Sequence, residues 1–328
     1  MSNSKSRPRI VVTRQIPETG IALLKKCFKV DLNTLDRDLT HRELLKKLDG
    51  AFGVVAMMAN RFDRQTISDL KTIRVISNFA VGFNNIDVAA ATGKGIVITN
   101  TPGVLTDATA DIAFGLLLAT ARRIAEGDRR IRARNFKGWT PTFMLGQDVS
   151  GKTIGIIGAG RIGTAVARRA KGFAMKILYY SRKRNPEMNS LGGTFVDLST
   201  LLVESDFVSL NVSLDSGTHG LIGRKELALM KSTAILINTA RGEVVDETAL
   251  VSALRKKKIG GAGLDVFVNE PKINQEFLKL DNVVLAPHLG SATFETRARM
   301  AEMAAMNAIA VLKGERPPGI VNTEVLET

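Results

Sequence analysis

The 328-residue sequence predicts an α/β protein made of two units, each with a parallel sheet covered by helices. The chain is longer than one hydrophobic core usually spans, and domains of about 100–200 residues are the usual solution. Short β-rich runs alternate with amphipathic stretches, which is typical of parallel sheets joined by helices. In the second half the strand candidates are nearly all apolar, as expected of strands buried on both faces.

The first unit is predicted from a short series of alternating elements. Its strand candidates are residues 10–13, 30–33, 54–58, 75–78 and 96–99. Helical patterns lie between several of them, such as 40–48 and 65–70. Thr40 can cap the first of these helices, and Glu43 three residues later completes a capping box. The series therefore predicts a small parallel α/β unit.

A longer series follows, after an apolar helix expected over residues 105–125 and a basic, loop-like segment over 127–150. Its strand candidates are residues 153–157, 177–180, 195–196, 207–212, 234–238, 263–266 and 283–286. A last helix, residues 295–312, is expected to end at Gly314, with Pro317 and Pro318 beyond it.

The charge and composition of the chain limit the classes of partner that we expect. A net charge of +14 attracts phosphate, but the basic residues are scattered and no DNA- or RNA-binding motif is present. The densest run, residues 122–137, places arginines at helical spacing among apolar residues, which is typical of a solvated helix face. The longest apolar stretch, residues 112–121, is shorter than the about 20 residues of a membrane span. We expect no nucleic-acid partner, no membrane anchor and no metal site. A single cysteine, Cys27, and no apolar leader predict a cytoplasmic protein.

Two glycine motifs lie close together. Residues 146–153, GQDVSGKT, satisfy the P-loop pattern, but Thr153 begins a strand where a P-loop would open a helix. Residues 158–163, GAGRIG, do follow a strand and open a helix. There Gly158 permits the tight turn, Gly160 lets the backbone approach a pyrophosphate, and Gly163 lets helix and strand pack closely. The free N–H groups of the helix then favour an anion. This motif predicts dinucleotide binding.

The end of the next strand bears on which dinucleotide is bound. NAD sites usually carry an acidic residue about 20 residues after the motif. Here Tyr180 runs into Ser181, Arg182, Lys183 and Arg184. A hydroxyl and cations would hold a 2′-phosphate, so we expect NADP(H) to be preferred and keep NAD(H) as the alternative. A solvated basic loop is the other interpretation.

Reduction of a carbonyl needs a proton donor, and histidine is the usual one. Of the three histidines, His41 lies in a polar helix and His219 in a turn. His288 follows an apolar strand, at the edge where open α/β sheets bind ligands. Its position therefore favours His288 as the proton donor.

Two further charged residues, Arg241 and Asp265, also follow apolar strands, and Glu270 lies just beyond. An arginine there can clamp a carboxylate with two hydrogen bonds. A glutamate beside a histidine would hold its ring and fix its tautomer. Taken singly, each could instead be a helix cap or an ion-pair partner.

Four segments, GIIGAGRIG, INTARGEVVD, GAGLDVFVNEP and LAPHLGSAT, resemble in this order the D-2-hydroxyacid dehydrogenase family. The resemblance includes NFAVGFNNID at 78–87 and TPGVLTDATAD at 101–111, and so covers essentially the whole chain. Within the family the chain is most similar to glyoxylate and hydroxypyruvate reductases, as the YYSR run supports.

The resemblance implies two Rossmann-like, doubly wound parallel-sheet domains. A cofactor domain, 101–289, would be inserted into a discontinuous substrate domain, 1–100 and 290–328. It also implies a homodimer and NADP-dependent reduction of a small 2-oxo acid, glyoxylate or hydroxypyruvate, to the 2-hydroxy acid. A 2-ketogluconate or other D-2-hydroxyacid dehydrogenase, and a dinucleotide-sensing regulatory protein, remain alternatives.

Site roles are implied as well. Arg241 would bind the substrate, His288 would donate the proton, and Glu270 would keep His288 protonated. The N–H groups of Val81 and Gly82 would hold the substrate carboxylate. Other implied substrate neighbours are Met58 and Trp139, the latter contributed by either subunit of the dimer. Implied cofactor contacts are Thr109, Gly158, Ala159, Gly160, Arg161, Ile162, Tyr180, Ser181, Arg182, Thr239, Ala240, Arg241, Asp265, His288 and Gly290.

Overall fold

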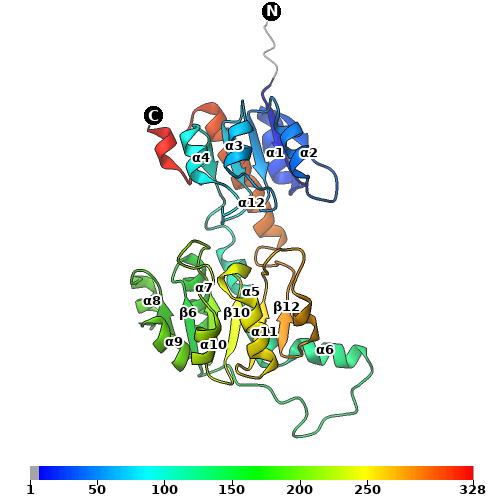
Figure 1. Cartoon of the computed structure of the whole chain (residues 1–328), viewed down its shortest axis with the longest axis vertical. Coiled ribbons are helices and arrows are strands. Elements are labelled where there is room, and N and C mark those ends of the chain that lie inside the picture. Colours follow the sequence, from blue (N-terminus) through cyan, green and yellow to red (C-terminus); the bar gives the residue numbers. More distant parts are fainter. Residues whose placement is uncertain (1–6, 328) are drawn as a thin grey trace, which may run out of the picture. The chain divides into compact units, whose positions relative to one another are not determined.

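The computed structural model describes residues 7–327 and divides into two compact units (Figure 1). Unit 1 combines Met1–Leu105 with Thr293–Thr328, and unit 2 is Thr106–Ala292. The boundaries expected from the sequence are residues 100 and 290, a few residues from those observed. Each unit is a parallel α/β structure, and the second is inserted into the first. The predicted fold class is therefore confirmed.

Unit 1 is built on a five-stranded parallel sheet of order β2-β1-β3-β4-β5. Its strands are β1 (Arg9–Val12), β2 (Lys29–Leu32), β3 (Gly53–Ala56), β4 (Val75–Asn78) and β5 (Val97–Thr99). Its α-helices are α1 (Glu18–Cys27), α2 (His41–Leu48), α3 (Arg64–Asp69), α4 (Val88–Gly93) and α12 (Phe294–Lys313). The inner strands β3 and β4 are buried throughout, because helices cover both faces of the sheet.

Two predicted helix ends of unit 1 are confirmed. The Thr40 side chain accepts from the Glu43 N–H at 3.3 Å, and Glu43 Oε2 accepts from the Thr40 N–H at 2.8 Å, so the capping box is present. At the other end of the chain α12 stops at Gly314, whose φ of 78° is the left-handed geometry that glycine adopts without strain.

Unit 2 is built on a seven-stranded parallel sheet of order β12-β11-β10-β9-β6-β7-β8. Its strands are β6 (Thr153–Ile157), β7 (Lys176–Tyr180), β8 (Thr194–Phe195), β9 (Phe207–Leu210), β10 (Ile235–Asn238), β11 (Gly261–Leu264) and β12 (Val283–Leu285). Its α-helices are α5 (Thr106–Ala121), α6 (Ile124–Arg132), α7 (Arg161–Gly172), α8 (Pro186–Ser190), α9 (Leu198–Glu204), α10 (Arg224–Leu229) and α11 (Glu247–Arg255). The first strand of this unit, β6, lies inside the sheet, and later strands are added on both sides of it, which is the topology that opens a ligand crevice at the carboxyl ends of the strands.

The region after α5 differs from the prediction. The single helix expected to residue 125 ends at Ala121, and a second helix, α6, occupies part of the segment predicted as loop. The break occurs because Arg123 adopts a left-handed φ of 53°. The Glu126 side chain then stabilises α6, since it is buried between Arg123 at 2.8 Å and Arg130 at 3.0 Å.

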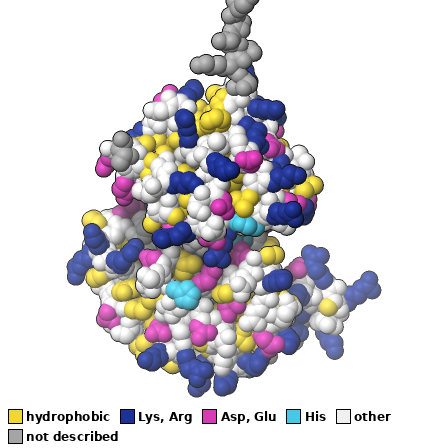
Figure 2. All heavy atoms as spheres, turned by 45° about the horizontal axis from the view of Figure 1, so that its top comes forward, with side chains coloured by type: hydrophobic (Ala, Val, Ile, Leu, Met, Phe, Trp, Pro, Cys, Tyr) yellow, Lys and Arg dark blue, Asp and Glu magenta, His cyan; other side chains and the backbone are white. Residues whose placement is uncertain are grey.

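In Figure 1, α6 and the segment after it stand away from the body of unit 2, and Figure 2 shows Lys and Arg side chains gathered there. The predicted solvated helix face thus covers only Ile124–Arg132. Among residues 7–327, no helix combines the length and apolar character needed to cross a membrane.

Candidate active site

The predicted site residues of unit 2 lie along one edge of its sheet, because parallel strands end together (Figure 1). From one side of the sheet to the other, this carboxyl edge carries His288 after β12, Asp265 and Glu270 after β11, Thr239–Arg241 after β10, Asn211 after β9, the glycine turn after β6 and Ser181–Arg182 after β7. The edge therefore places the predicted chemistry at one end and the predicted 2′-phosphate contacts at the other.

The glycine turn has the geometry that its motif predicts. Gly158 has a φ of 98°, and a Cβ there would lie 2.6 Å from the Asn211 carbonyl oxygen. A Cβ on Gly163 would lie 2.0 Å from the Gly158 carbonyl oxygen, so only glycine lets α7 begin this close to β6. A Cβ on Gly160, in contrast, would meet no atom within 4 Å. The space beside Gly160 is open to a ligand that approaches the N-terminus of α7.

Two buried polar atoms at this edge make no hydrogen bond within the described chain. They are Asn211 Oδ1, just past β9, and Thr239 Oγ1, just past β10. Unsatisfied buried oxygens are costly unless a ligand or water meets them. Together with the open face of Gly160, they fit the amide and hydroxyl groups of a dinucleotide. Asn211 was missed because the predicted strand ran through it to residue 212, whereas β9 ends at Leu210.

The basic loop after β7 is solvent-facing. Arg182 is 88% exposed and its guanidinium lies 3.4 Å from the Asp215 carboxylate. The guanidinium of Arg184 lies 5.2 Å from the centre of the Phe195 ring. Ser181 donates its hydroxyl hydrogen to the Lys183 carbonyl. The cations are thus present at the predicted place, with one acidic neighbour that the sequence analysis did not identify.

Asn185 links this basic loop to the glycine turn. Its Nδ2 donates to the Ala159 carbonyl at 2.8 Å and to the Thr164 hydroxyl at 3.2 Å. Its own N–H donates to the buried Tyr179 hydroxyl at 3.2 Å. The two predicted phosphate-contacting segments are therefore held in fixed register by one side chain, which no spacing rule reveals.

His288 and Glu270 are brought together as expected. His288 Nδ1 lies 2.7 Å from Glu270 Oε2, and Glu270 Oε1 accepts from the Phe267 N–H at 2.9 Å. Although burial raises the pKa of Glu270, the hydrogen bond and charge of His288, the Phe267 N–H and the Arg241 charge together hold that pKa below its ordinary value. Glu270 is therefore a carboxylate at neutral pH, and it fixes the imidazole so that Nε2 is left for other partners.

Asp265 ties the backbone around His288. Its carboxylate accepts from the Leu289 N–H at 2.6 Å and from the Gly290 N–H at 2.8 Å. His288 itself has a left-handed φ of 55°, which this pair of bonds helps to maintain. Thr109 donates to the Gly290 carbonyl at 2.9 Å, so it lies beside this turn. Burial raises the pKa of Asp265, and the two N–H groups oppose that rise.

Arg241 begins the short helical turn Gly242–Val244 after β10. Its guanidinium donates to the Ala240 carbonyl at 2.6 Å, while Asn238 Nδ2 holds the Arg241 carbonyl at 2.9 Å. Burial lowers the pKa of Arg241, and the carboxylates of Glu270 and Glu243 oppose this. Arg241 and Glu270 are thus close enough to interact electrostatically, so the three predicted catalytic side chains share one corner of the edge.

In unit 1 the predicted carboxylate-binding residues lie in a loop after β4. The Val81 carbonyl accepts from Asn100 Nδ2 and the Gly82 carbonyl from Asn78 Nδ2, each at 2.7 Å. Within residues 7–327, neither the Val81 N–H nor the Gly82 N–H donates a hydrogen bond. Two neighbouring donors are therefore left for an anion. Met58 lies beside this loop, since its sulfur is 3.6 Å from Asn78 Nδ2.

Trp139 lies far from regular structure, in the segment after α6, and is 79% exposed. Within residues 7–327, Trp139 makes no hydrogen bond or ring contact with the other predicted site residues. In a single chain, Trp139 is therefore not among the predicted site residues that the fold brings together.

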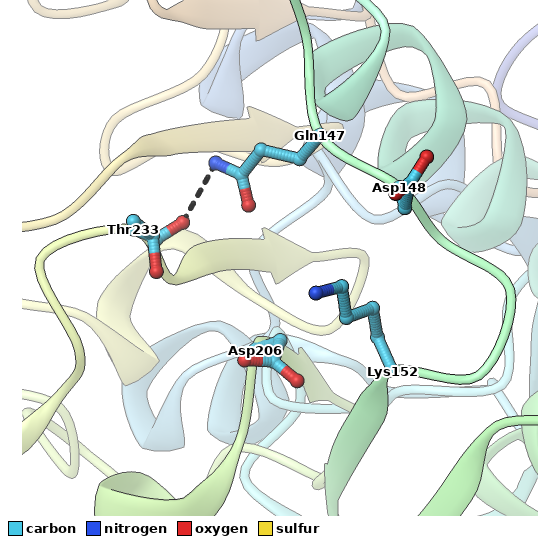
Figure 3. Close-up of a pocket in the computed structure, with 5 residues that line it drawn as sticks. All are labelled: Gln147, Asp148, Lys152, Asp206 and Thr233. Carbon is cyan, nitrogen blue, oxygen red and sulfur yellow. Dashed lines mark hydrogen bonds between the residues drawn. The ribbon is translucent and has the colours of Figure 1, made fainter.

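The P-loop-like segment adopts no P-loop. Lys152 precedes β6 and extends into a cavity of about 200 Å³ that is also lined by Gln147, Asp148, Asp206 and Thr233 (Figure 3). Asp206 accepts from the Thr153 N–H at 2.9 Å, which fixes it at the amino end of the sheet. No helix N-terminus follows Lys152, so the prediction against this motif is confirmed.

Comparison with known proteins identifies the family. The model of the D-isomer specific 2-hydroxyacid dehydrogenase, NAD binding domain, matches residues 114–290. A glyoxylate reductase of Thermococcus litoralis is 51% identical over 325 residues, which are 98% of each chain. The TT0316 protein of Thermus thermophilus has a TM-score of 0.89 and 43% identity, over 95% of this chain and 99% of that one. An NADPH-dependent glyoxylate/hydroxypyruvate reductase of Sinorhizobium meliloti, solved with NADP and malonate, has a TM-score of 0.87 and 32% identity over 98% of both chains.

The likeness extends through both units, because the aligned regions cover nearly all of each chain. The matched family model spans the glycine turn, the basic loop and the three predicted catalytic side chains. Unit 2 is accordingly a nicotinamide-dinucleotide-binding unit, and the resemblance stated from the sequence motifs is confirmed. This chain belongs to the D-isomer specific 2-hydroxyacid dehydrogenase family.

Proposed function

We propose that this protein reduces glyoxylate or hydroxypyruvate to the 2-hydroxy acid with NADPH as the reductant. Its family membership makes it a dehydrogenase acting on small 2-oxo and 2-hydroxy acids. The observation that carries the proposal is the His288–Glu270 contact of 2.7 Å, at the same sheet edge as the dinucleotide turn. A histidine held by a carboxylate is a suitable proton donor at neutral pH.

The residues of this corner have separable tasks. When bound, NADPH supplies the hydride. Arg241 binds the carboxylate and carbonyl oxygen of the substrate, because a guanidinium offers several parallel donors. His288 donates the proton that the reduced oxygen takes up, and Glu270 keeps the imidazole oriented through its contact with Nδ1. Asp265 holds the turn at Gly290, which lines the nicotinamide pocket together with Thr239 and Ala240.

The backbone donors of unit 1 complete the substrate contacts. The N–H groups of Val81 and Gly82 hold the substrate carboxylate, and Met58 forms a wall of the pocket. Support comes from the carbonyl groups of both residues, which are engaged elsewhere while their N–H groups are not.

NADPH is preferred over NADH because residues 181–184, after β7, are a hydroxyl residue and three cations with no acid among them. Ser181 and Arg182 bind the 2′-phosphate, with Lys183 or Arg184 assisting. Thr109 and residues 158–162 contact the other phosphates, and Tyr180 borders the adenosine. The solved relative from Sinorhizobium meliloti binds NADP, which supports this preference.

The protein acts as a homodimer through α6 and the segment that follows it. Five large apolar side chains are exposed there by 52–79%: Ile124, Ile131, Phe136, Trp139 and Leu145. Exposed apolar surface of this extent typically marks a protein interface. Trp139 is the one tryptophan, so its fluorescence reports on this region directly. Light scattering should give twice the mass of the 35.5 kDa chain. Because a lone cysteine needs no oxidising compartment, we place the enzyme in the cytoplasm.

Steady-state oxidation of NADPH and NADH by the purified protein tests the proposal, each with glyoxylate, hydroxypyruvate and 2-ketogluconate. Turnover that favours NADPH with glyoxylate or hydroxypyruvate is expected. Preference for NADH would contradict the 2′-phosphate assignment and leave the catalytic side chains standing. Preference for 2-ketogluconate would identify that acid as the substrate in place of glyoxylate and hydroxypyruvate. Tight NADPH binding with no turnover would favour a dinucleotide-sensing protein.

A further inference from the structure

The loop of residues 79–85 in unit 1 uses its two kinds of backbone group unequally. Carbonyl groups accept along it: Ala80 from the Thr101 N–H at 2.9 Å, Phe83 from the Ile86 N–H at 3.0 Å and Asn85 from the Phe62 N–H at 2.8 Å. The carbonyls of Val81 and Gly82 accept from side chains instead. Among residues 7–327 the Val81 and Gly82 N–H groups donate no hydrogen bond although both carbonyls are engaged, and such a pair of neighbouring donors suits an anion.

Each of the two peptide groups that flank Gly82 is hydrogen-bonded by a different asparagine. Asn100 Nδ2 binds the carbonyl of the peptide between Val81 and Gly82, so it sets the direction of the Gly82 N–H, because the two groups of a trans peptide point opposite ways. Asn78 Nδ2 binds the carbonyl of the peptide between Gly82 and Phe83. Glycine has more backbone freedom than any other residue, and here that freedom is removed from both sides.

The two asparagines are themselves fixed by residues outside the loop or at its end. Asn78 is 0% exposed, ends β4 and exchanges amide hydrogen bonds with Asn85 at 3.3 Å. Asn100 is 9% exposed, and its carbonyl accepts from Asn307 of α12 at 2.9 Å. The Asn100 N–H donates to the Gly319 carbonyl at 2.8 Å. The positions of the Val81 and Gly82 N–H groups therefore depend on side chains that the sheet and α12 hold in place.

We propose that Asn78 and Asn100 are positioning residues for the substrate carboxylate. Asn100 sets the direction of the Gly82 N–H, and Asn78 holds the peptide on the other side of Gly82. The Val81 N–H belongs to the peptide whose Ala80 carbonyl accepts from the Thr101 N–H, so the two donors form a fixed pair. The inference rests on the proposed function, in which those two N–H groups bind a 2-oxo acid. Preorganised donors bind an anion more tightly than mobile ones, since no ordering is needed at binding.

The test compares Asn100→Asp and Asn78→Asp with the wild-type protein. An aspartate keeps the size of the side chain but cannot donate, and its charge repels the carbonyl that the amide held. The Ki of oxalate at saturating NADPH and the KM of glyoxylate should rise about tenfold, because a lost hydrogen bond and a freed loop each cost binding. The value of kcat should change less, and the Kd of NADPH should stay within about twofold. If an aspartate variant does not fold, the alanine variant removes the donor without adding charge and serves the same comparison.

Asn33→Asp is the matched control. Asn33 is 2% exposed in the same unit and donates to the Thr13 carbonyl at 3.0 Å and the Arg37 carbonyl at 3.2 Å. It should lose thermal stability comparably but keep the oxalate Ki. If folded variants of Asn78 and Asn100 had a wild-type Ki for oxalate, the inference would be wrong while the proposed function would stand. The same would follow if Asn33→Asp raised the oxalate Ki as much as they do. Wild-type protein that neither reduces glyoxylate nor binds oxalate would overturn the proposed function, and the inference with it.

Discussion

The glycine turn of unit 2 and the loop of residues 79–85 in unit 1 are both backbone segments suited to anions, but different forces shape them. In the turn, sterics decide: a Cβ at Gly158 or Gly163 would meet backbone oxygens 2.6 Å or 2.0 Å away. In the loop, side-chain amides decide: Asn78 and Asn100 bind its carbonyls at 2.7 Å. The turn is marked by a six-residue motif, although the oxygen that confines Gly158 belongs to Asn211, just past β9. The loop depends on side chains at the end of β4 and just past β5.

The contrast implies that the two segments fail differently. A turn made by close approach has no room for a side chain, so a substitution disturbs it directly. A loop held by hydrogen bonds can keep its fold when one bond is lost, while its donors lose their direction. Substitutions in the two segments should therefore differ in how they change stability and anion binding, and a substitution at His288, which belongs to neither segment, should change catalysis.

His288→Ala should have the largest effect, because it removes the proton donor and leaves both anion-binding segments in place. Loss of general acid catalysis typically costs about 10²–10⁴-fold, so reduction of glyoxylate should nearly vanish. The Kd of NADPH, measured by fluorescence titration, should remain close to the wild-type value. His41→Ala, at an exposed position of α2, serves as the control. Equal loss of turnover and NADPH binding would assign His288 a structural role.

Gly160→Ala and Gly163→Ala test the turn as a pair. A Cβ on Gly160 meets nothing within 4 Å, so the protein should keep its melting temperature while the added methyl occupies the space of the pyrophosphate. Overpacking costs about 1–3 kcal/mol, which raises the Kd of NADPH about tenfold or more. Gly163→Ala should instead lower the melting temperature, since its Cβ meets the Gly158 carbonyl. Wild-type NADPH affinity in Gly160→Ala, measured by calorimetry, would contradict the pyrophosphate assignment.

Arg182→Ala tests the far end of the same edge. The variant should bind NADPH about tenfold more weakly, because a hydrogen bond to a charged group contributes about 1.5–3 kcal/mol and exposure reduces that value. Binding of NADH should be unchanged. The difference between the two cofactors should shrink at high salt, since Arg182 is 88% exposed. Arg224→Ala, an exposed arginine on α10, is the control. Equal weakening of NADPH and NADH binding would place Arg182 away from the 2′-phosphate.

Glu270→Gln should lower turnover less than His288→Ala does, because glutamine keeps the size of the side chain beside Nδ1 of His288. The lowered pKa of Glu270 keeps its carboxylate charged throughout the neutral range, so the substitution removes a charged hydrogen-bond partner of the imidazole. The kcat for glyoxylate at saturating NADPH should fall about tenfold, as expected when a hydrogen bond to a charged group is lost. A wild-type kcat in this variant would separate Glu270 from catalysis.

The same variant has a stability signature with a definite sign. Because the pKa of Glu270 is lower in the folded chain than in the unfolded chain, its charge stabilises the fold above the unfolded value, about 4.3. That contribution disappears as the pH falls through the folded value. Glu270→Gln should thus unfold more easily than wild type near pH 7, and the two melting temperatures should converge in acid. A constant difference across this range would contradict the ionised pair.

Local patterns predicted much of the fold. The capping box at Thr40 and the stop at Gly314 depend on residues adjacent in sequence, and the glycine turn is marked by a six-residue motif, so each can be recognised in a few letters. The break between α5 and α6 could not be predicted this way. It depends on a left-handed arginine, Arg123, and on a buried glutamate, Glu126, whose arginine partners only the folded helix brings close.

The site was predictable where one residue marks a strand end, as at Arg241 and His288, and through family motifs elsewhere. Asn185 escaped because it acts on Ala159, 26 residues earlier, and asparagine has no signature for that role. Asn78 and Asn100 stand in recognised segments, but their amides act on backbone atoms that sequence motifs do not describe. Long-range contacts between a side chain and the backbone therefore separate what was predicted from what was missed.

The most direct test of the two-segment account crosses one variant from each unit. The Kd of NADPH and the Ki of oxalate at saturating NADPH would be measured for Gly160→Ala, Asn100→Asp and the double variant. The account predicts that Gly160→Ala weakens only NADPH binding, that Asn100→Asp weakens only oxalate binding, and that the double variant shows both changes unaltered in size. If either single variant weakened both ligands equally, the two segments would not be separate anion sites, and the account would be wrong.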